Sequence, residues 1–292
     1  MAAGRYSGRS SKALRVLAAA LIIFVAACSS VFGASYTWNP HANGDGSSWT
    51  DGANWNGTDT ADYPDGADDS VLFDGAVAAA VNVPAGLPLG SLTLDQSGGT
   101  NGQDLTMAGN LTLSDTTLSG NLEIANANSS LTVSGNILEI SGTLTVSAGS
   151  LTNGTGTVRF TGSQADTAST GIGDVVVASS ANLTLLSGLQ ATDLTVEGTL
   201  DTNGQNHSAS GIYTLNGRVR HNGTGTVDTI DANNGTVEYY TGTVTGLPFG
   251  SSYHHLEISS GDWTLSAPLT VNGNLTVSGG TLDGNTGGPY GI

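Results

Sequence analysis

Cysteine is almost missing from this sequence: Cys28 is the single cysteine among 292 residues. No intramolecular disulfide can form, and cysteines cannot build a metal site. A chain of this size that folds without disulfides needs another source of stability. Stacking of repeated strands provides one, because each strand then binds the strands before and after it.

Basic residues are also scarce. Four of the seven Lys and Arg residues lie within the first 15 positions, which leaves Arg159, Arg218 and Arg220 in the rest of the chain. All 24 Asp and Glu residues follow position 44, so the chain after the leader has a net charge near −21. This balance argues against nucleic acid, anionic membrane surfaces and polyanionic substrates as partners.

Segments with the period of a helix are missing after residue 33, and residues 1–33 have the pattern of a secretory signal peptide. Basic residues precede an apolar run from Val16 to Ala27, which has the length of a signal h-region and is too short for a comfortable membrane span. We therefore expect a protein that is secreted or held at a bacterial cell surface. No transmembrane segment is expected once the signal is removed.

Two processing sites compete at the end of this leader. The sequence Val31-Phe32-Gly33 suits an ordinary signal peptidase, which would leave a mature chain from Ala34. The residues before Cys28 resemble a lipobox, which would leave a lipid-modified Cys28 at the N-terminus of an outer-membrane lipoprotein. Ordinary cleavage is favoured, with lipidation of Cys28 as the alternative.

Short strands separated by turns are abundant from Gly90 onward. Seven segments between Ser91 and Val146 place apolar residues two apart and then break at Ser, Asn or Gly: SLTL, DLTM, NLTL, NLEI, SLTV, ILEI and TLTV. The stretch Leu269–Asp283 shows the unit most clearly, with three very short strands separated by the corners NGN and SGG. Strands this short must stack on similar strands, so the pattern predicts a solenoid.

A longer period of about 80 residues is superimposed on this unit. GTVRFTG at 156–162 matches GTVEYYTG at 235–242, and DLTVEGTLD at 193–201 matches NLTVSGGTLD at 274–283. We expect three or four coils per long repeat, and we expect the repeat region, residues 90–292, to be truncated at its C-terminal end. Corner spacing varies between repeats, which favours a right-handed solenoid over a left-handed hexapeptide one.

Asparagine recurs at the predicted corners, at Asn110, Asn121, Asn136, Asn182 and Asn274. Asn tolerates left-handed backbone conformations, and its side chain can bond to the side chain in the neighbouring coil. Some of these residues lie in N-x-Ser/Thr sequons, but the corner role explains them without glycosylation.

Residues 34–89 differ in composition and are expected to form an N-terminal cap with the first coils. They contain three of the four tryptophans, Trp38, Trp49 and Trp55, and most of the prolines. Exposed tryptophan rings could bind sugars by stacking. Buried rings would plug the open end of the first coil, and this interpretation is favoured because a solenoid must shield its apolar core at its ends.

This segment also carries a resemblance to a known family. YTWNP, SSWTDGANWNG and YPDGADDSVLF resemble the leading segment of bacterial surface proteins with autotransporter-associated β-strand repeats. The resemblance implies a passenger-like structural or adhesive protein that is secreted or displayed on the cell surface. With the strand pattern, it predicts an all-β fold: a right-handed, single-stranded parallel β-helix with an aromatic-rich N-terminal cap.

Catalytic groups are few. Arg218 and Arg220 would share one face of a strand and form a possible anion-binding pair, while Val219 and His221 share the other face. A solvent-facing coil edge is the favoured interpretation, because no acidic cluster obviously accompanies the pair. Glu123 and Glu139 could stack as the paired carboxylates of a hydrolase.

Metal ligation has two weak candidates. His254 and His255 are adjacent, and side chains of adjacent strand residues point to opposite faces, so they are not expected to bind one ion. The acidic turn that contains Asp65, Asp68 and Asp69 is a better match for Ca²⁺, a hard cation that prefers several oxygen ligands. Solvated acidic turns are the favoured interpretation, so we expect no cofactor, with Ca²⁺ as the alternative.

The sequence as a whole favours a non-catalytic structural or adhesive repeat protein. Its extended faces would bind a polysaccharide or protein at the cell surface or outside the cell. Two alternatives stay open. The first is a polysaccharide-active β-helix enzyme, a lyase or hydrolase, although the NTD and GHG motifs of pectin-cleaving enzymes are absent. The second is a carbohydrate-binding module that uses Trp38, Trp49 and Trp55.

Overall fold

The structure is a computed structural model of the 292-residue chain. It describes residues 33–38, 47–55, 63–73, 81–95, 104–107, 110–113, 120–152, 154–166, 172–228, 230–231 and 233–284. The predicted signal peptide, including its lipidation candidate Cys28, lies outside the described residues except for Gly33.

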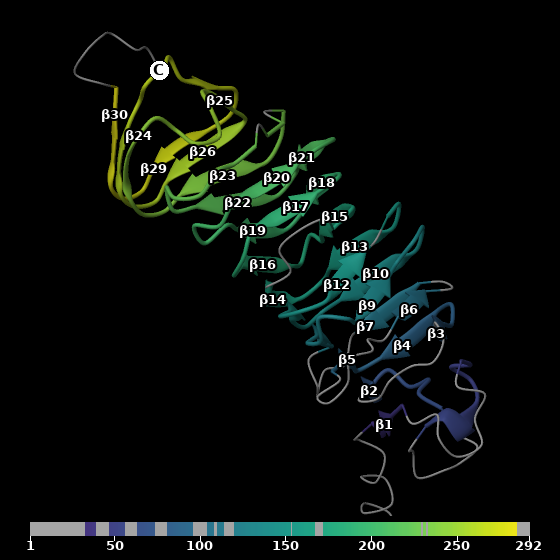
Figure 1. Cartoon of the computed structure of the whole chain (residues 1–292). Coiled ribbons are helices and arrows are strands. Elements are labelled where there is room, and N and C mark those ends of the chain that lie inside the picture. The colour runs from purple at the N-terminus through teal and green to yellow at the C-terminus, as the bar shows by residue number, and fades with distance from the viewer. Residues whose placement is uncertain are drawn as a thin grey trace, which may run out of the picture. The chain divides into compact units, whose positions relative to one another are not determined.

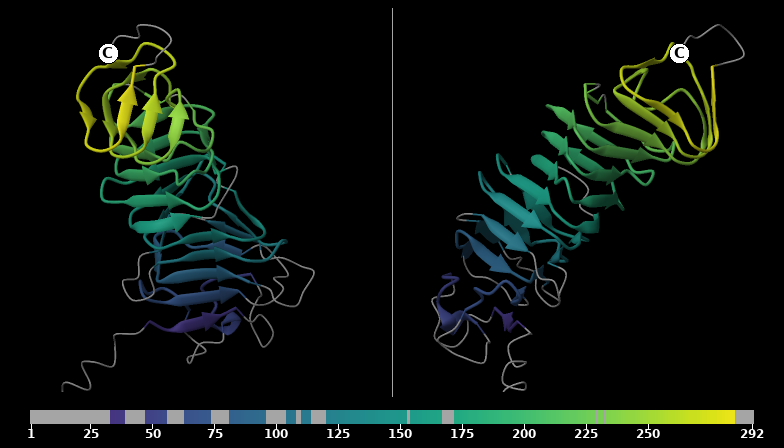
Figure 2. Two further views of the ribbon diagram at one scale, coloured as in Figure 1. Left: turned by 90° about the vertical axis from the view of Figure 1, so that its left-hand side faces the viewer. Right: turned by 180° about the vertical axis from the view of Figure 1, so that it is seen from behind.

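The longest sheet contains twelve strands and follows the chain from one coil to the next, and we call its outer surface the first face (Figure 1). Its strands, in spatial order, are β1 (Ser35–Thr37), β2 (Ser70–Phe73), β5 (Ser91–Leu94), β8 (Leu122–Ile124), β11 (Leu144–Val146), β14 (Ser163–Asp166), β16 (Asn182–Leu185), β19 (Thr199–Asp201), β22 (Arg218–His221), β23 (Thr236–Tyr239), β26 (His255–Ile258) and β29 (Leu275–Val277). Neighbouring strands in this sheet are parallel, and Figure 2 shows them as successive rungs.

After every first-face strand except β1, β14 and β22, the next strand belongs to one of three shorter sheets, and we call this position the second face. These sheets contain β3 (Val81–Val83), β6 (Asp104–Met107), β9 (Ser130–Thr132) and β12 (Ser150–Thr152); β17 (Leu189–Ala191) and β20 (His207–Ala209); and β24 (Thr243–Thr245), β27 (Asp262–Thr264) and β30 (Thr281–Asp283).

The remaining strands complete the coils, and we call their position the third face. One sheet contains β4 (Leu87–Leu89), β7 (Leu111–Leu113), β10 (Ile137–Ile140), β13 (Thr157–Phe160), β15 (Asp174–Val177), β18 (Leu194–Val196) and β21 (Tyr213–Leu215); a second contains β25 (Ser252–Tyr253) and β28 (Thr270–Val271). A short 3₁₀ helix, η1 (Gly52–Asn54), lies in the N-terminal region.

This arrangement confirms the predicted all-β parallel β-helix with an aromatic cluster near its N-terminal end. Each of the seven short segments predicted between Ser91 and Val146 contains a strand, from β5 to β11. The stretch Leu269–Asp283 also divides as predicted, into β28, β29 and β30.

The core is built from in-register apolar ladders. Leu92, Leu122 and Leu144 lie opposite one another on three successive first-face strands, and all three are buried. The intervening outward positions hold polar residues such as Thr93 and Glu123. Burying one leucine side chain contributes about 1.5–3 kcal/mol, so repetition of this ladder over many coils stabilises strands that are too short to persist alone.

Side chains of corner residues form hydrogen bonds between successive coils. Most of their partners are backbone groups, whereas side-chain partners were predicted. The Asn110 Oδ1 atom accepts a hydrogen bond from the backbone N–H of Ile137, and Asn121 Oδ1 accepts one from Thr143. A side-chain to side-chain bond of the predicted kind joins Asn182 to Ser163. The corner asparagines therefore supply acceptors to backbone N–H groups that the short strands leave without a ladder partner.

The 80-residue sequence repeat does not correspond to an equivalent position in the coils. Its two GTV segments form β13 on the third face and β23 on the first face. Likewise, residues 193–201 form β18 and β19, on the third and first faces, whereas the matching residues 274–283 form β29 and β30, on the first and second. The same strand-and-corner sequence occurs on every face. Two segments with matching sequences therefore form the same local structure, but they need not lie on the same face of the coil.

The coil that follows β22 shows no second-face or third-face strand among its described residues. Between β22 and β23, the described residues of 222–235 form turns and bends without a strand, and we call this part of the chain the strandless stretch. The second-face sheet ends before it at β20 and the third-face sheet ends at β21, and new sheets begin after it at β24 and β25. Among the sheets that the described residues form, the first-face sheet is the one that continues through this coil.

Candidate functional site

The first face carries a cluster of charged residues beside the strandless stretch. Asp201, Arg220, Glu238 and Glu257 occupy matching outward positions on β19, β22, β23 and β26, and Arg218 lies two residues before Arg220. Val219 and His221 point inward and are fully buried, as the strand alternation predicted. We call Asp201, Arg218, Arg220, Glu238, Tyr240 and Glu257 the charged cluster.

Both arginines bridge two carboxylates on different strands. The Arg218 Nη1 atom lies 2.8 Å from Glu238 Oε2 and 2.8 Å from Glu257 Oε2. Arg220 bonds to Asp201 through Nη1 at 2.7 Å and to Glu238 through Nε at 3.1 Å. The cluster therefore contains more carboxylates than cations, and each guanidinium is paired.

Glu238 is the centre of this network. Its other carboxylate oxygen, Oε1, accepts a hydrogen bond from Ser259 at 2.7 Å. Burial raises the pKa of Glu238, but hydrogen bonds from Ser259, Arg218 and Arg220 outweigh burial, so its pKa lies below the ordinary value. Glu238 is thus held ionised, which is the opposite of the raised pKa that a general acid requires.

Tyr240 contacts two members of the network, Asp201 and Arg220. Its hydroxyl donates a hydrogen bond to Asp201 Oδ1 at 2.9 Å, and the Arg220 guanidinium lies 4.4 Å from the centre of its ring. Burial and the bond to Asp201 raise the pKa of Tyr240 to about 12. The tyrosine is therefore a neutral donor that also stacks on a cation.

These contacts correct one premise of the sequence analysis. Arg218 and Arg220 do share a face, but an acidic cluster accompanies them, formed by residues from coils on both sides. Each guanidinium already binds two carboxylates, and the surroundings of the pair are acidic, which disfavours an anion at this place. The pair acts as a structural brace across four strands.

The paired-carboxylate candidate is also corrected. Glu123 lies on β8 in the first-face sheet, opposite Thr93 and Thr145. Glu139 lies on β10 in the third-face sheet, opposite Thr112 and Arg159. The two carboxylates belong to different sheets and cannot stack as a hydrolase pair.

The three N-terminal tryptophans lie together in the interior. Trp38, Trp49 and Trp55 are 1%, 2% and 5% exposed, and their rings contact one another and Phe73 at centroid distances of 4.8–5.9 Å. Trp49 Nε1 donates to the Pro64 carbonyl and Trp55 Nε1 to the Trp49 carbonyl. Sugar stacking needs an exposed ring face, and none of these three rings has one. Their packing agrees with the plug interpretation.

The calcium candidates do not converge. Asp69 is buried, and both its oxygens accept backbone hydrogen bonds: Oδ1 from Ala34, and Oδ2 from Asp65 and Gly66. Asp65 itself is exposed and Asp68 is half-buried. Within the described ranges, no group of three or more His, Cys, Asp and Glu residues could hold a metal ion. Asp69 instead ties the start of the β-helix to the turn before β2.

His254 and His255 lie closer together than predicted. His254 precedes β26, so strand alternation does not separate the two side chains, and their ring centres are 4.3 Å apart. His255 Nδ1 accepts a hydrogen bond from the backbone N–H of Asn274 at 2.9 Å. One of its two ring nitrogens is therefore occupied by the next coil.

A buried polar aromatic cluster, which the sequence analysis missed, lies inside the coils next to the strandless stretch. His207 and His221 are buried, and each ring lies about 5.5 Å from that of Phe249 (5.4 and 5.5 Å). His221 Nδ1 is 3.0 Å from the Thr202 hydroxyl, and His207 Nε2 is 3.3 Å from the Tyr213 hydroxyl. The sequence signal that could have indicated this cluster is the inward position of each histidine in the strand alternation.

Burial suppresses the charge of this cluster. Burial and the neighbouring His221 lower the pKa of His207 to about 4, against an opposing effect of Asp228. Burial also lowers the pKa of His221 to about 4, against the attraction of Asp201. Both imidazoles are neutral at pH 7. His207 Nδ1 and His221 Nε2 have no hydrogen-bond partner within the described structure.

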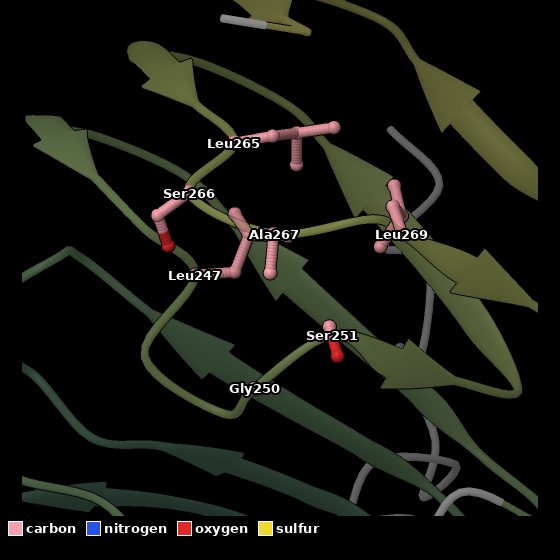
Figure 3. A pocket seen from close by; sticks show the side chains of 7 residues that line it. All are labelled: Leu247, Gly250, Ser251, Leu265, Ser266, Ala267 and Leu269. Carbon is pink, nitrogen blue, oxygen red and sulfur yellow. The ribbon is translucent and has the colours of Figure 1, made fainter. Parts of the chain in front are cut away.

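A small cavity lies between two stacked loops in the last coils. It has a volume of about 140 Å³ and is lined by residues of the loop after β24 and the loop after β27. Figure 3 shows Leu247, Leu265 and Leu269 around this space, with the hydroxyls of Ser251 and Ser266 as its polar side-chain groups. Ligand sites are usually larger, at about 300–1,000 Å³. The lining also contains no titratable side chain.

Comparison with known proteins adds no assignment. No family model, curated protein or solved structure matches this chain. The resemblance to surface proteins with autotransporter-associated repeats therefore stays a prediction. In the part of the chain that the structure describes, no helix is long and apolar enough to cross a membrane.

Proposed function

We propose that this protein is a non-catalytic structural or adhesive β-solenoid, exported from a bacterial cell and acting at the cell surface or outside the cell. The observation that carries the proposal is the pairing of Arg218 and Arg220 with carboxylates from neighbouring coils. The residues with the strongest catalytic potential in the sequence thus hold coils together. The net charge near −21 of the chain after residue 33 is consistent with a soluble, well-hydrated surface.

The outer faces support an adhesive role. Outward side chains on the third-face sheet form an in-register ladder: Thr112, Glu139, Arg159, Val176, Thr195 and Thr214. Adjacent side chains in such a ladder are about 4.8 Å apart. A regular row of this kind offers a long, shallow surface, which suits an extended polymer or a flat protein partner better than a small substrate.

The enzyme alternative has less support. A lyase or hydrolase of polysaccharides needs a base or acid with a suitable pKa and free access to the substrate. The pKa of Glu238 is lowered, and the guanidiniums occupy the space beside each carboxylate of the charged cluster. The arrangement therefore favours a role of these residues in holding the coils together over a role in proton transfer.

Binding of the purified full chain to immobilised polysaccharides and extracellular proteins tests the proposal. We expect saturable binding to at least one polymeric partner, with no chemical change in that partner. Absence of binding to every member of a broad panel would contradict the adhesive role.

A further inference from the structure

A polar groove crosses the second face over β17 and β20. It has a volume of about 450 Å³, three times that of the cavity in Figure 3. Its lining comes from four successive coils: Ile172, residues 190–192, residues 208–210 and Asp228. None of these residues belongs to the charged cluster or to the N-terminal aromatic cluster.

The strand pairing explains why a groove forms at this place. β17 and β20 make a sheet of only two strands. On one side, the described residues of the preceding coil contribute a single bridge, from Ile172 to Ala191. On the other side, the strandless stretch replaces a third strand, and Asp228 Oδ2 accepts the hydrogen bond of the Ala209 N–H at 3.3 Å. The second face is therefore interrupted on both sides of a narrow sheet.

The lining combines small buried residues with exposed polar ones. Ala191 and Ala209 are buried at inward positions of β17 and β20. Gln190, Thr192 and Ser210 are exposed. Ser208 lies opposite Gln190 in the strand register. The groove thus presents an amide, several hydroxyls and the Asp228 carboxylate, with no cation in its lining.

This chemistry selects one ligand class. Amide, hydroxyl and carboxylate groups exchange hydrogen bonds with the hydroxyls of a sugar. The carboxylates of a uronate polymer would be repelled by Asp228 and by the negative net charge of this protein. The groove lining has no cation to offset that repulsion, so anionic polysaccharides are disfavoured. Coils succeed one another every 4.7–4.9 Å, close to the length that each sugar unit adds to an extended chain.

We propose that this groove binds a neutral polysaccharide laid across the coils, with about one sugar unit per coil. The inference rests on the proposed adhesive function and specifies its site and ligand class. Gln190 and Ser208 contact the sugar hydroxyls from adjacent strands, and Asp228 accepts from a third hydroxyl at the end of the groove.

Calorimetric titration of the full chain with neutral hexasaccharides of glucan, xylan and mannan, and with hexagalacturonate as the anionic comparator, tests the proposal. We expect binding of at least one neutral oligosaccharide and none of hexagalacturonate. Ser208→Trp fills the groove and is expected to abolish binding. Gln190→Ala removes one exposed hydrogen-bonding group and is expected to weaken binding about tenfold.

Thr199→Trp is the matched control, because Thr199 is an outward residue of the same coil on the first face, outside both the groove and the third-face ladder. It should leave binding unchanged. Melting temperatures establish that each variant folds, and Gln190→Ala carries the test if Ser208→Trp does not fold. Equal affinity in wild type, Ser208→Trp and Gln190→Ala would overturn the groove assignment while leaving the adhesive function in place. Binding of proteins or hexagalacturonate alone would overturn the neutral-sugar class, again without removing adhesion.

Discussion

Arg218 and Glu257 are separated by 39 residues in the sequence, yet Arg218 Nη1 lies 2.8 Å from Glu257 Oε2. The bond passes across β23 and joins β22 to β26. It spans the strandless stretch, whose described residues form no second-face or third-face strand, so it stabilises the first-face sheet where that sheet continues. Hydrogen bonds to charged groups contribute about 1.5–3 kcal/mol each, less where solvent reaches them.

Glu238→Gln should destabilise the protein, because Glu238 accepts hydrogen bonds from both arginines and Ser259. We expect the free energy of unfolding to fall by about 2 kcal/mol. Denaturation in urea measures the change. Glu123→Gln is the control, since Glu123 lies on the same face opposite two threonines, and its effect should stay below about 0.5 kcal/mol. Equal losses in the two variants would show that the charged cluster is not a brace.

Acid should destabilise the fold through His207 and His221. Both have folded-state pKa values of about 4, below the ordinary 6.5, so the unfolded chain binds protons that the folded chain does not. Stability is therefore greatest above pH 6.5 and falls as the pH drops from 6.5 to 4, by at most about 3 kcal/mol per histidine. The lowered pKa of Glu238 adds to the loss at the acidic end, where this carboxylate becomes protonated.

Melting temperatures between pH 7.5 and 4 measure this dependence. His221→Gln should flatten the curve even if it lowers the melting temperature at pH 7.5. A wild-type melting temperature that is constant over this range would refute the role of the buried histidines.

Trp49→Ala tests the N-terminal plug. Removing a fully buried tryptophan creates a cavity and exposes the apolar end of the first coils, so we expect a loss of about 3–5 kcal/mol. Hydrogen exchange should place the loss of protection in β1, β2 and β5 before the distant coils, because a solenoid transmits stability between neighbours. Reduced glycan binding with an unchanged melting temperature would favour the sugar-stacking alternative instead.

Gly217→Ala tests the close stacking of corners. A Cβ atom at this position would lie 2.1 Å from the carbonyl oxygen of Gly198 in the preceding coil. The coils would have to separate locally, and we expect a melting temperature several degrees lower. Gly188→Ala is the matched control, since its Cβ would make an ordinary contact of 3.4 Å with Asn206. Tolerance of both substitutions would contradict the corner geometry.

The strands themselves could be predicted from the sequence, because the alternation of apolar and polar residues sets which side chains point inward. Their place in the coil could not. Successive first-face partners are 17 residues apart from Leu183 to Leu200 but 30 apart from Leu92 to Leu122. With corners of such variable length, the register between coils is not set by any local pattern.

The charged cluster depends on this register. Arg220 meets Asp201, 19 residues earlier, and Glu238, 18 residues later, only because the coils between them have nearly the same length. The groove over β17 and β20 was equally hidden, since it results from neighbouring coils whose described residues form no second-face strand beside this sheet. The sequence does place His207 and His221 at inward positions, but not beside each other.

We infer that the residues with catalytic potential hold the solenoid together and do not turn over a substrate. Incubation of the purified full chain with pectin, alginate and neutral polysaccharides, with and without Ca²⁺, tests this inference. New reducing ends and unsaturated products are measured over time for wild type, Arg220→Ala and Arg159→Ala. We expect no product with any of the three proteins. Product formed by wild type and by Arg159→Ala but lost in Arg220→Ala would contradict it.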